Sequence, residues 1–331
     1  MPLQIKHEER KRGTDMKKVL AVLLIVIVML SFAGCGVKKD NTSPEEGTQE
    51  KDSYVIGFSN RLDSDPWMIT FKNRLMELDE ENDAFEMLYA DANGNDQKQV
   101  EQIDNFFVQG IDALIIIPNN GAAVVDSVKQ ANERGIPVAA ISTAPNEGEY
   151  IFVGCSHYDT GFSQGEYCAE VLPEGAKVLY LGGNSSFQIS VDRKQGFYDG
   201  LGDRADDLEI LSEQECDYTM DNGMTIMEDW IQTFPEFDAV VCVNDQSALG
   251  AIEALKGANK LDGKVVCGID CLDIAAESVK NGELSMSVLQ DPGLHADKCM
   301  EALLKVLDGG TSEDTITIPV TVVTKDNVND L

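Results

Sequence analysis

Residues 113–143 read ALIIIPNNGAAVVDSVKQANERGIPVAAIST, and this stretch decides the fold class. It begins and ends with short apolar runs, 113–118 and 138–143, and an amphipathic segment lies between them. Apolar runs rich in Val and Ile that alternate with amphipathic segments are typical of a parallel sheet covered by helices. The stretch therefore predicts a strand, a helix and a second strand joined by a right-handed crossover.

The same alternation continues along most of the chain. Helices are expected between the strands, because apolar residues such as Met68, Phe71 and Leu75 recur at steps of three and four. The sequence predicts nine strands, which are too many for one open sheet of ordinary width. We therefore predict an α/β protein with two doubly wound parallel-sheet lobes. The predicted strands are 55–60, 85–91, 113–118, 138–143, 177–182, 209–216, 239–244, 265–270 and 284–290.

The composition is that of a folded and strongly acidic protein. The chain has 331 residues, of which 43% are hydrophobic, and a formal net charge of −32. This length allows about two domains. Because so acidic a surface repels phosphate backbones, we expect no nucleic-acid partner.

The N-terminus has the pattern of an export signal. Lys17 and Lys18 precede an apolar run, 19–30, which is followed by Ala33-Gly34-Cys35. About a dozen apolar residues are too few for a transmembrane helix, which needs about 20. The last three residues resemble a bacterial lipobox, which implies that Cys35 is acylated. We therefore expect a lipid-anchored protein at the outer face of the cytoplasmic membrane.

Cysteine spacing gives no sign of a metal site. Seven cysteines follow Cys35, and an odd number cannot pair completely. Several lie in apolar runs, so we expect mostly buried thiols. No Cys-x-x-Cys pair occurs, and residues 91–96 lack the Gly and the later Glu that a calcium loop needs. We predict neither a metal nor a cofactor.

Polar and aromatic side chains stand near the carboxyl ends of several predicted strands, where open α/β sheets bind their ligands. These groups form hydrogen bonds or cover flat surfaces, which suits a sugar, since its ring has hydroxyls at the edge and C–H groups on the faces. Two alternatives remain open. The aromatic residues could belong to the core, and Asp65 and Asp245 could cap helices, which is the preferred role of Asp245. The candidate ligand-binding residues are Asp65, Trp67, Ser142, Arg193, Tyr218, Asn244, Asp270 and Gln290.

Several motifs resemble, in their order and spacing, the sugar-binding proteins of bacterial ABC importers of the ribose, galactose and glucose type, which have the type I periplasmic binding protein fold. They are 91–104, 110–116, 135–138, 244–250 and 268–270. The resemblance implies that Asp65 binds the sugar edge and that Trp67 and Tyr218 stack on the ring. It also implies that Arg193, Asn244, Asp270 and Gln290 donate or accept hydrogen bonds. Ser142-Thr143 stands where the ribose branch has Asp-Arg, and Asp65 before an aromatic residue favours a hexose such as galactose or glucose.

The resemblance further implies three crossings between the lobes, a hinge that closes on the sugar, and delivery to an ABC permease with its ATPase. We expect a monomer. The implied division of the chain is a signal peptide at 1–34, a flexible tether at 35–53, an N-lobe at 54–156 plus 291–319, and a C-lobe at 157–290 plus 320–331.

Three other functions are alternatives to sugar import. A sensor that presents a sugar-like signal to a receptor would share this sequence pattern, and this alternative stays open. A glycosidase would use Asp65 and Asp270 as its acid and base, but no nucleophile or phosphate-binding motif accompanies them. A repressor would carry an N-terminal DNA-binding unit where this chain has an apolar segment. We therefore predict a binding protein and not an enzyme.

Overall fold

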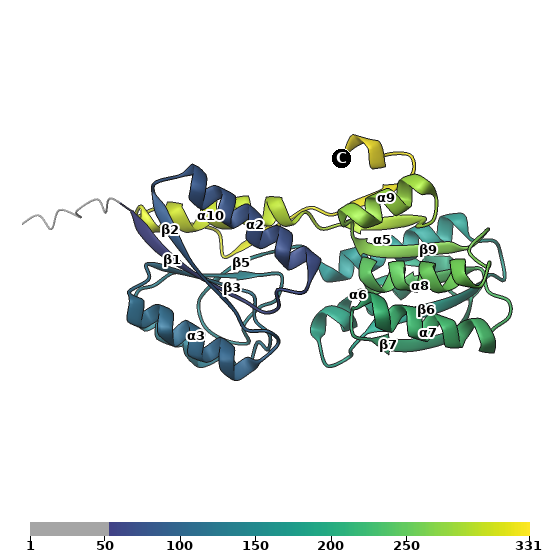
Figure 1. The fold of residues 1–331 in the computed structure, drawn as a ribbon, viewed down its shortest axis with the longest axis horizontal. Coiled ribbons are helices and arrows are strands. Elements are labelled where there is room, and N and C mark those ends of the chain that lie inside the picture. The colour runs from purple at the N-terminus through teal and green to yellow at the C-terminus, as the bar shows by residue number, and fades with distance from the viewer. Residues whose placement is uncertain (1–52) are drawn as a thin grey trace, which may run out of the picture. The chain divides into compact units, whose positions relative to one another are not determined.

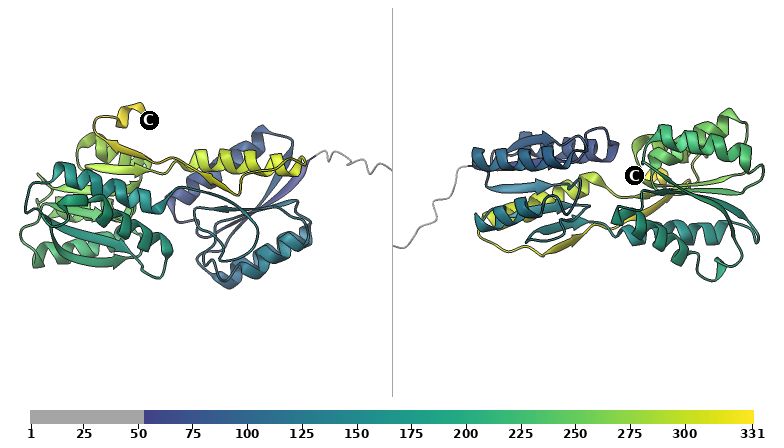
Figure 2. Two further views of the ribbon diagram at one scale, coloured as in Figure 1. Left: turned by 180° about the vertical axis from the view of Figure 1, so that it is seen from behind. Right: turned by 90° about the horizontal axis from the view of Figure 1, so that it is seen from below.

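The structure is a computed structural model that describes residues 53–331. The predicted signal peptide, Cys35 and nearly all of the predicted tether lie outside the described residues. The described part of the chain forms two six-stranded sheets, as Figure 1 shows, and helices lie on both faces of each sheet (Figure 2). The prediction of two parallel-sheet α/β lobes is confirmed.

The first sheet has the strand order β11-β5-β4-β3-β1-β2, and its neighbouring strands are parallel. Helices α2 and α10 pack on one face, because their apolar residues share a core cluster with Ile56 and Ile115. Helices α3 and α4 pack on the other face against Leu114 and Ile116. The elements are β1 (Tyr54–Asn60), α2 (Pro66–Glu81), β2 (Phe85–Asp91), α3 (Asp96–Gln109), β3 (Ala113–Ile116), α4 (Val125–Glu133), β4 (Val138–Ile141), β5 (Ile151–Gly154), α10 (Pro292–Leu307) and β11 (Thr315–Thr317).

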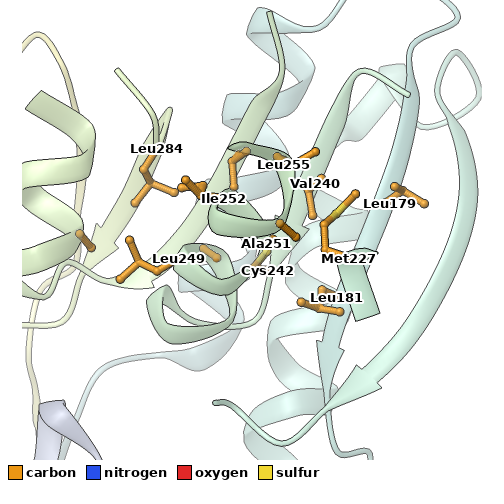
Figure 3. Packing of buried hydrophobic residues seen from close by; sticks show 14 of the residues in the cluster. Leu179, Leu181, Met227, Val240, Cys242, Leu249, Ala251, Ile252, Leu255 and Leu284 are labelled. Carbon is orange, nitrogen blue, oxygen red and sulfur yellow. The ribbon is translucent and has the colours of Figure 1, made fainter. Parts of the chain in front are cut away.

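The second sheet has the order β12-β10-β9-β8-β6-β7, in which only β12 runs antiparallel to its neighbour. Helices α7, α8 and α9 cover one face, where Leu249, Ile252 and Val240 belong to one buried apolar cluster (Figure 3). Helices α5 and α6 cover the other face. The elements are α5 (His157–Val171), β6 (Lys177–Gly183), α6 (Gln188–Gly200), β7 (Glu209–Cys216), α7 (Met220–Thr233), β8 (Ala239–Cys242), α8 (Asp245–Gly257), β9 (Val265–Asp270), α9 (Asp273–Asn281), β10 (Met286–Leu289) and β12 (Thr321–Thr324), with 3₁₀ turns at Gly202–Arg204 and Val328–Asp330.

The sequence analysis missed three strands, β5, β11 and β12. They are three or four residues long, and β11 and β12 lie at sheet edges with exposed Thr side chains. A short polar edge strand lacks the apolar run that marks a buried strand. Several predicted strands also end earlier than expected, since β3 ends at Ile116, β4 at Ile141 and β8 at Cys242. The residues that follow them belong to loops.

Helices α2 and α8 begin beside the two aspartates that the sequence offers as helix caps. Asp65 caps α2, because its Oδ1 accepts hydrogen bonds from the backbone N–H groups of Trp67 (2.9 Å) and Met68 (3.4 Å). The preferred capping role of Asp245 is wrong. The cap of α8 is Asn244, whose side-chain oxygen accepts from the Ser247 N–H. Asn244 takes the N-cap position because its backbone is extended, whereas Asp245 is already the first helical residue.

Helices α5 and α6 pack with their backbones in direct contact. A Cβ atom at Gly161 would lie 1.9 Å from the carbonyl oxygen of Arg193, and one at Gly196 would lie 2.0 Å from the carbonyl oxygen of Tyr158. Only glycine allows this approach. The contact fixes the helix that carries Arg193, which is one of the candidate ligand-binding residues.

The described cysteines agree with the expectation of buried thiols. All seven described cysteines are buried and unpaired, as expected. The described residues contain no group of three His, Cys, Asp or Glu side chains that could hold a metal ion. Among the described helices, none has both the length and the apolarity needed to cross a bilayer.

Candidate functional site

A cavity of about 520 Å³ lies where the carboxyl ends of strands from both sheets meet. Strands β1 and β4 of the first sheet lead into it, as do β7, β8 and β9 of the second sheet. All eight candidate residues line this cavity: Asp65, Trp67, Ser142, Arg193, Tyr218, Asn244, Asp270 and Gln290. The structure thus brings together residues that are up to 225 positions apart in the sequence.

Trp67 forms part of the cavity wall and part of the core. Its indole N–H donates to the backbone oxygen of Gln290 at 2.7 Å, and its ring stacks on Phe71 with 5.7 Å between centroids. The side chain is only 7% exposed. The Trp67 ring therefore packs in the core and also lines the cavity, so the two roles do not exclude each other.

Arg193, Asp270 and Gln290 form a buried polar group on the second sheet's side. The Arg193 Nη1 donates to the Val243 backbone oxygen at 2.7 Å, and its Nη2 lies 4.0 Å from Asp270 Oδ1. The same Asp270 oxygen accepts from the Gln290 side-chain amide at 2.8 Å. Burial raises the pKa of Asp270 well above its usual range, and the Arg193 guanidinium opposes that rise.

Part of the Arg193 guanidinium has no partner in the described protein. Its Nε is buried and makes no hydrogen bond to any described residue. Buried polar atoms are nearly always paired, with protein, water or ligand. Arg193 therefore offers a spare donor in a polar group that already contains the Asp270 carboxylate.

Tyr218 and Asn244 hold each other in place. Asn244 donates one amide hydrogen to the Tyr218 backbone oxygen at 3.0 Å, while its side-chain oxygen caps α8. The Tyr218 hydroxyl forms a hydrogen bond with the Ser190 hydroxyl. Asn244 thus has one free amide hydrogen at most, which makes it as much a support for the cavity wall as a ligand contact.

The backbone is strained at three of the eight candidate residues. Ser142 has φ +56°, Tyr218 has φ +66° and Asp270 has φ +116°, which non-glycine residues rarely adopt. Near Asp270 the surrounding structure fixes this conformation, because the Leu272 N–H donates to the buried carboxylate of Asp245 at 2.9 Å. Strain of this kind is common where a fold must aim side chains at a ligand.

Arg61 and His157 are among the further residues that line the cavity and that the sequence analysis did not name as ligand-binding. Arg61 directly follows β1, and its Nη2 lies 4.0 Å from Asp65 Oδ2. Its position beyond a strand end was the available signal. His157 begins α5, and its Nε2 lies 2.9 Å from the Ser142 carbonyl oxygen. No local pattern marked it, because the neighbours that place it are distant in sequence.

Comparison with known proteins gives a consistent picture. Residues 56–311 match the periplasmic binding protein domain. The chain is 29% identical over 311 residues to the ribose import binding protein RbsB of Bacillus subtilis (strain 168), which covers 94% of this chain and 100% of that protein. It is 31% identical over 281 residues to a putative rhizopine-binding protein of Rhizobium meliloti, which covers 83% of this chain and 91% of that protein.

A solved structure resembles the chain throughout its folded part. It is an ABC transporter solute binding protein from Bacillus halodurans C-125 with bound myo-inositol. The identity is 29%, the TM-score is 0.79, and the alignment covers 86% of this chain and 98% of that protein.

Proposed function

The chain belongs to the periplasmic binding protein domain family, and from this premise we propose that it captures a hexose or an inositol between its two lobes and delivers it to an ABC permease. Proteins of this family bind sugars and carry out no chemical reaction. The chain is accordingly a binding protein and not an enzyme.

The single observation that carries the proposal is the convergence of all eight candidate residues on one cavity. Its volume of about 520 Å³ lies in the range typical of small-molecule sites. Arg193 supplies donors, Asp65 and Asp270 supply acceptors, and Trp67 and Tyr218 supply aromatic surface. A ring with hydroxyls on its edge uses all of these groups.

The preference for a six-membered ring has two supports. Asp65 followed by the aromatic Trp67 favours a hexose in the sequence, and a structural relative with 29% identity holds myo-inositol. Charge-assisted hydrogen bonds to Arg or Asp contribute about 1.5 to 3 kcal/mol each when water is excluded. A few such bonds around one ring are enough for selective binding.

The path of the chain supports hinge closure. The chain passes between the two sheets in three short segments, 155–156, 290–291 and 318–320. With these segments as hinges, the lobes are 54–156 plus 291–319 and 157–290 plus 320–331. Because the sugar gains contacts to both lobes only when they come together, it shifts the population toward the closed form.

Thermal unfolding of the purified protein tests the ligand class. The panel contains D-glucose, D-galactose, D-ribose, myo-inositol, nucleosides and amino acids. A ligand at 100 times its Kd stabilises the folded state by about 2.7 kcal/mol, so a hexose or inositol should raise the melting temperature clearly. A panel in which only nucleosides or amino acids raise it would overturn the proposal.

We also propose that the protein is tethered to the outer face of the cytoplasmic membrane through an acylated Cys35. The support is the apolar run 19–30 that precedes Ala33-Gly34-Cys35. The full-length protein should sediment with membranes, and the Cys35→Ala variant should not. Equal sedimentation of the two proteins would argue against the lipid anchor.

A further inference from the structure

His157 lies where the chain passes from the first sheet to the second, and it lines the cavity. It is the first residue of α5, directly after the segment that leaves β5 of the first sheet. Its Nε2 lies 2.9 Å from the carbonyl oxygen of Ser142, which follows β4. The side chain lines the cavity of the proposed sugar site.

The Ser142 contact fixes the chemistry of the His157 ring. A carbonyl oxygen can only accept a hydrogen bond, so the proton of the ring is on Nε2. Burial and the nearby Arg193 guanidinium lower the pKa of His157 to about 3, which keeps the ring neutral. In a neutral ring with the proton on Nε2, the other nitrogen, Nδ1, is an acceptor with a free lone pair.

This second nitrogen is buried and has no hydrogen-bond partner among the described residues. Its position is fixed, because the ring is held by Ser142 and the Ser156 hydroxyl caps the helix that begins at His157. The left-handed backbone of Ser142, at φ +56°, is part of the same arrangement. Buried acceptors are nearly always paired, with protein, water or ligand, and a molecule that fills the cavity lined by His157 can supply the donor.

We propose that His157 is a ligand-recognising residue whose Nδ1 accepts a hydrogen bond from a hydroxyl group of the bound hexose or inositol. This inference rests on the proposed function and specifies its ligand further. Acceptors at His157, Asp65 and Asp270 need a ligand that donates, whereas the guanidinium of Arg193 needs one that accepts. Hydroxyl groups do both, so a ligand with several hydroxyl groups matches both kinds of side chain.

Isothermal titration calorimetry tests this role on the purified full-length protein. The probe is whichever of D-glucose, D-galactose or myo-inositol binds the wild type most tightly, together with its monodeoxy analogues. His157→Phe keeps an aromatic ring but removes the acceptor, and it should raise the Kd of the parent probe at least about tenfold, which is about 1.4 kcal/mol. Tyr158→Phe, a change at the next residue and outside the cavity lining, is the matched control and should leave the Kd unchanged.

The deoxy analogues separate recognition from mere support. One analogue should bind the wild type with about the same Kd as the parent probe has for His157→Phe. The Kd of that analogue should not rise further in His157→Phe, since the two changes remove the same hydrogen bond. The inference is wrong if every analogue loses affinity, relative to the parent probe, by the same factor in both proteins. It is also wrong if His157→Phe binds the parent probe with the wild-type Kd. In both cases the proposed function stands. If the wild type binds none of the three probes, the proposed function itself falls.

A measurement on the wild type covers the case in which His157→Phe does not fold. The ¹⁵N resonance of His157 Nδ1 should shift when the parent probe is added, because the nitrogen gains a hydrogen bond. The shift should be much smaller with the deoxy analogue that lacks the partner hydroxyl. Equal shifts with the parent and with every analogue would contradict a direct bond.

Discussion

Asp245 is a buried residue that holds the loop next to Asp270, one of the candidate ligand-binding residues. Its carboxylate accepts from the Ser287 hydroxyl at 2.7 Å and from the Leu272 N–H at 2.9 Å, and these bonds fix the loop after Asp270. The side chain is fully buried. Burial raises the pKa of Asp245 to about 7 from an ordinary value of 3.8, against the effect of its two hydrogen bonds.

This raised pKa predicts a pH dependence of stability. The folded state holds the Asp245 proton more tightly than the unfolded state does, so the stabilisation is complete below about pH 4 and is lost as pH rises toward about 7. Between pH 5 and pH 8, the wild type should lose more unfolding free energy than Asp245→Asn, by an amount on the order of 2 kcal/mol. Urea unfolding of both proteins at the two pH values measures this difference.

The comparison between the two proteins is needed because other groups titrate in the same range. Burial lowers the pKa values of His157 and His295, and their contribution to stability is lost as pH falls, which is the opposite direction. Both proteins share these histidines, so they cancel in the difference. An identical pH dependence in wild type and Asp245→Asn would show that Asp245 ionises normally in the fold.

The pairing of α5 with α6 controls the site from a distance. The side chain of Arg193 enters the cavity from α6, while its backbone oxygen lies against Gly161 of α5. A methyl group at Gly161 cannot fit at 1.9 Å from that oxygen, so the helices must separate. The position of the guanidinium therefore depends on a glycine that does not line the cavity.

Gly161→Ala should destabilise the protein by about 2 kcal/mol or more, which is the usual range for overpacking. It should also weaken sugar binding, because α6 moves with Arg193. Gly257→Ala is the matched control, since Gly257 is a helical glycine of α8 with nothing within 4 Å of the added methyl group. This control should be neutral or more stable by about 0.5–1 kcal/mol. Equal effects of the two changes in chemical unfolding would refute the packing argument.

The proposed closure of the two lobes involves the whole molecule. The hydrogen bond from the Trp67 indole to Gln290 already links α2 of the first sheet to the segment after β10 of the second. Under the proposed function, a bound sugar adds contacts to Asp65 on one side and to Arg193 and Asp270 on the other. Binding energy from both lobes is available only in the closed form.

Small-angle X-ray scattering should therefore show a smaller radius of gyration at a saturating concentration of the sugar that raises the melting temperature. A sugar from the same panel that leaves the melting temperature unchanged should also leave the radius unchanged. The forward scattering should correspond to a monomer in both states. An unchanged radius at full saturation would mean that the site binds without hinge motion.

Local patterns in the sequence were sufficient for the fold class. Apolar runs such as 113–118 and helical spacings such as Met68, Phe71 and Leu75 report directly on burial, because side-chain direction repeats with a fixed period in strands and helices. The short edge strands β11 and β12 were not predicted, since an exposed strand needs no apolar run. Positions near strand ends and the family resemblance then supplied eight residues that all line one cavity.

The tertiary structure decided which polar atoms of those residues remain available. Asn244 and Asp245 are adjacent in sequence, yet one caps a helix and the other fixes a loop, because Asp245 meets Ser287 only in the folded protein. His157 received no role from the sequence, and its place beside the cavity follows from its contact with Ser142. Sequence periodicity records whether a side chain is buried. The partner of each hydrogen bond depends on chain segments that only folding brings together.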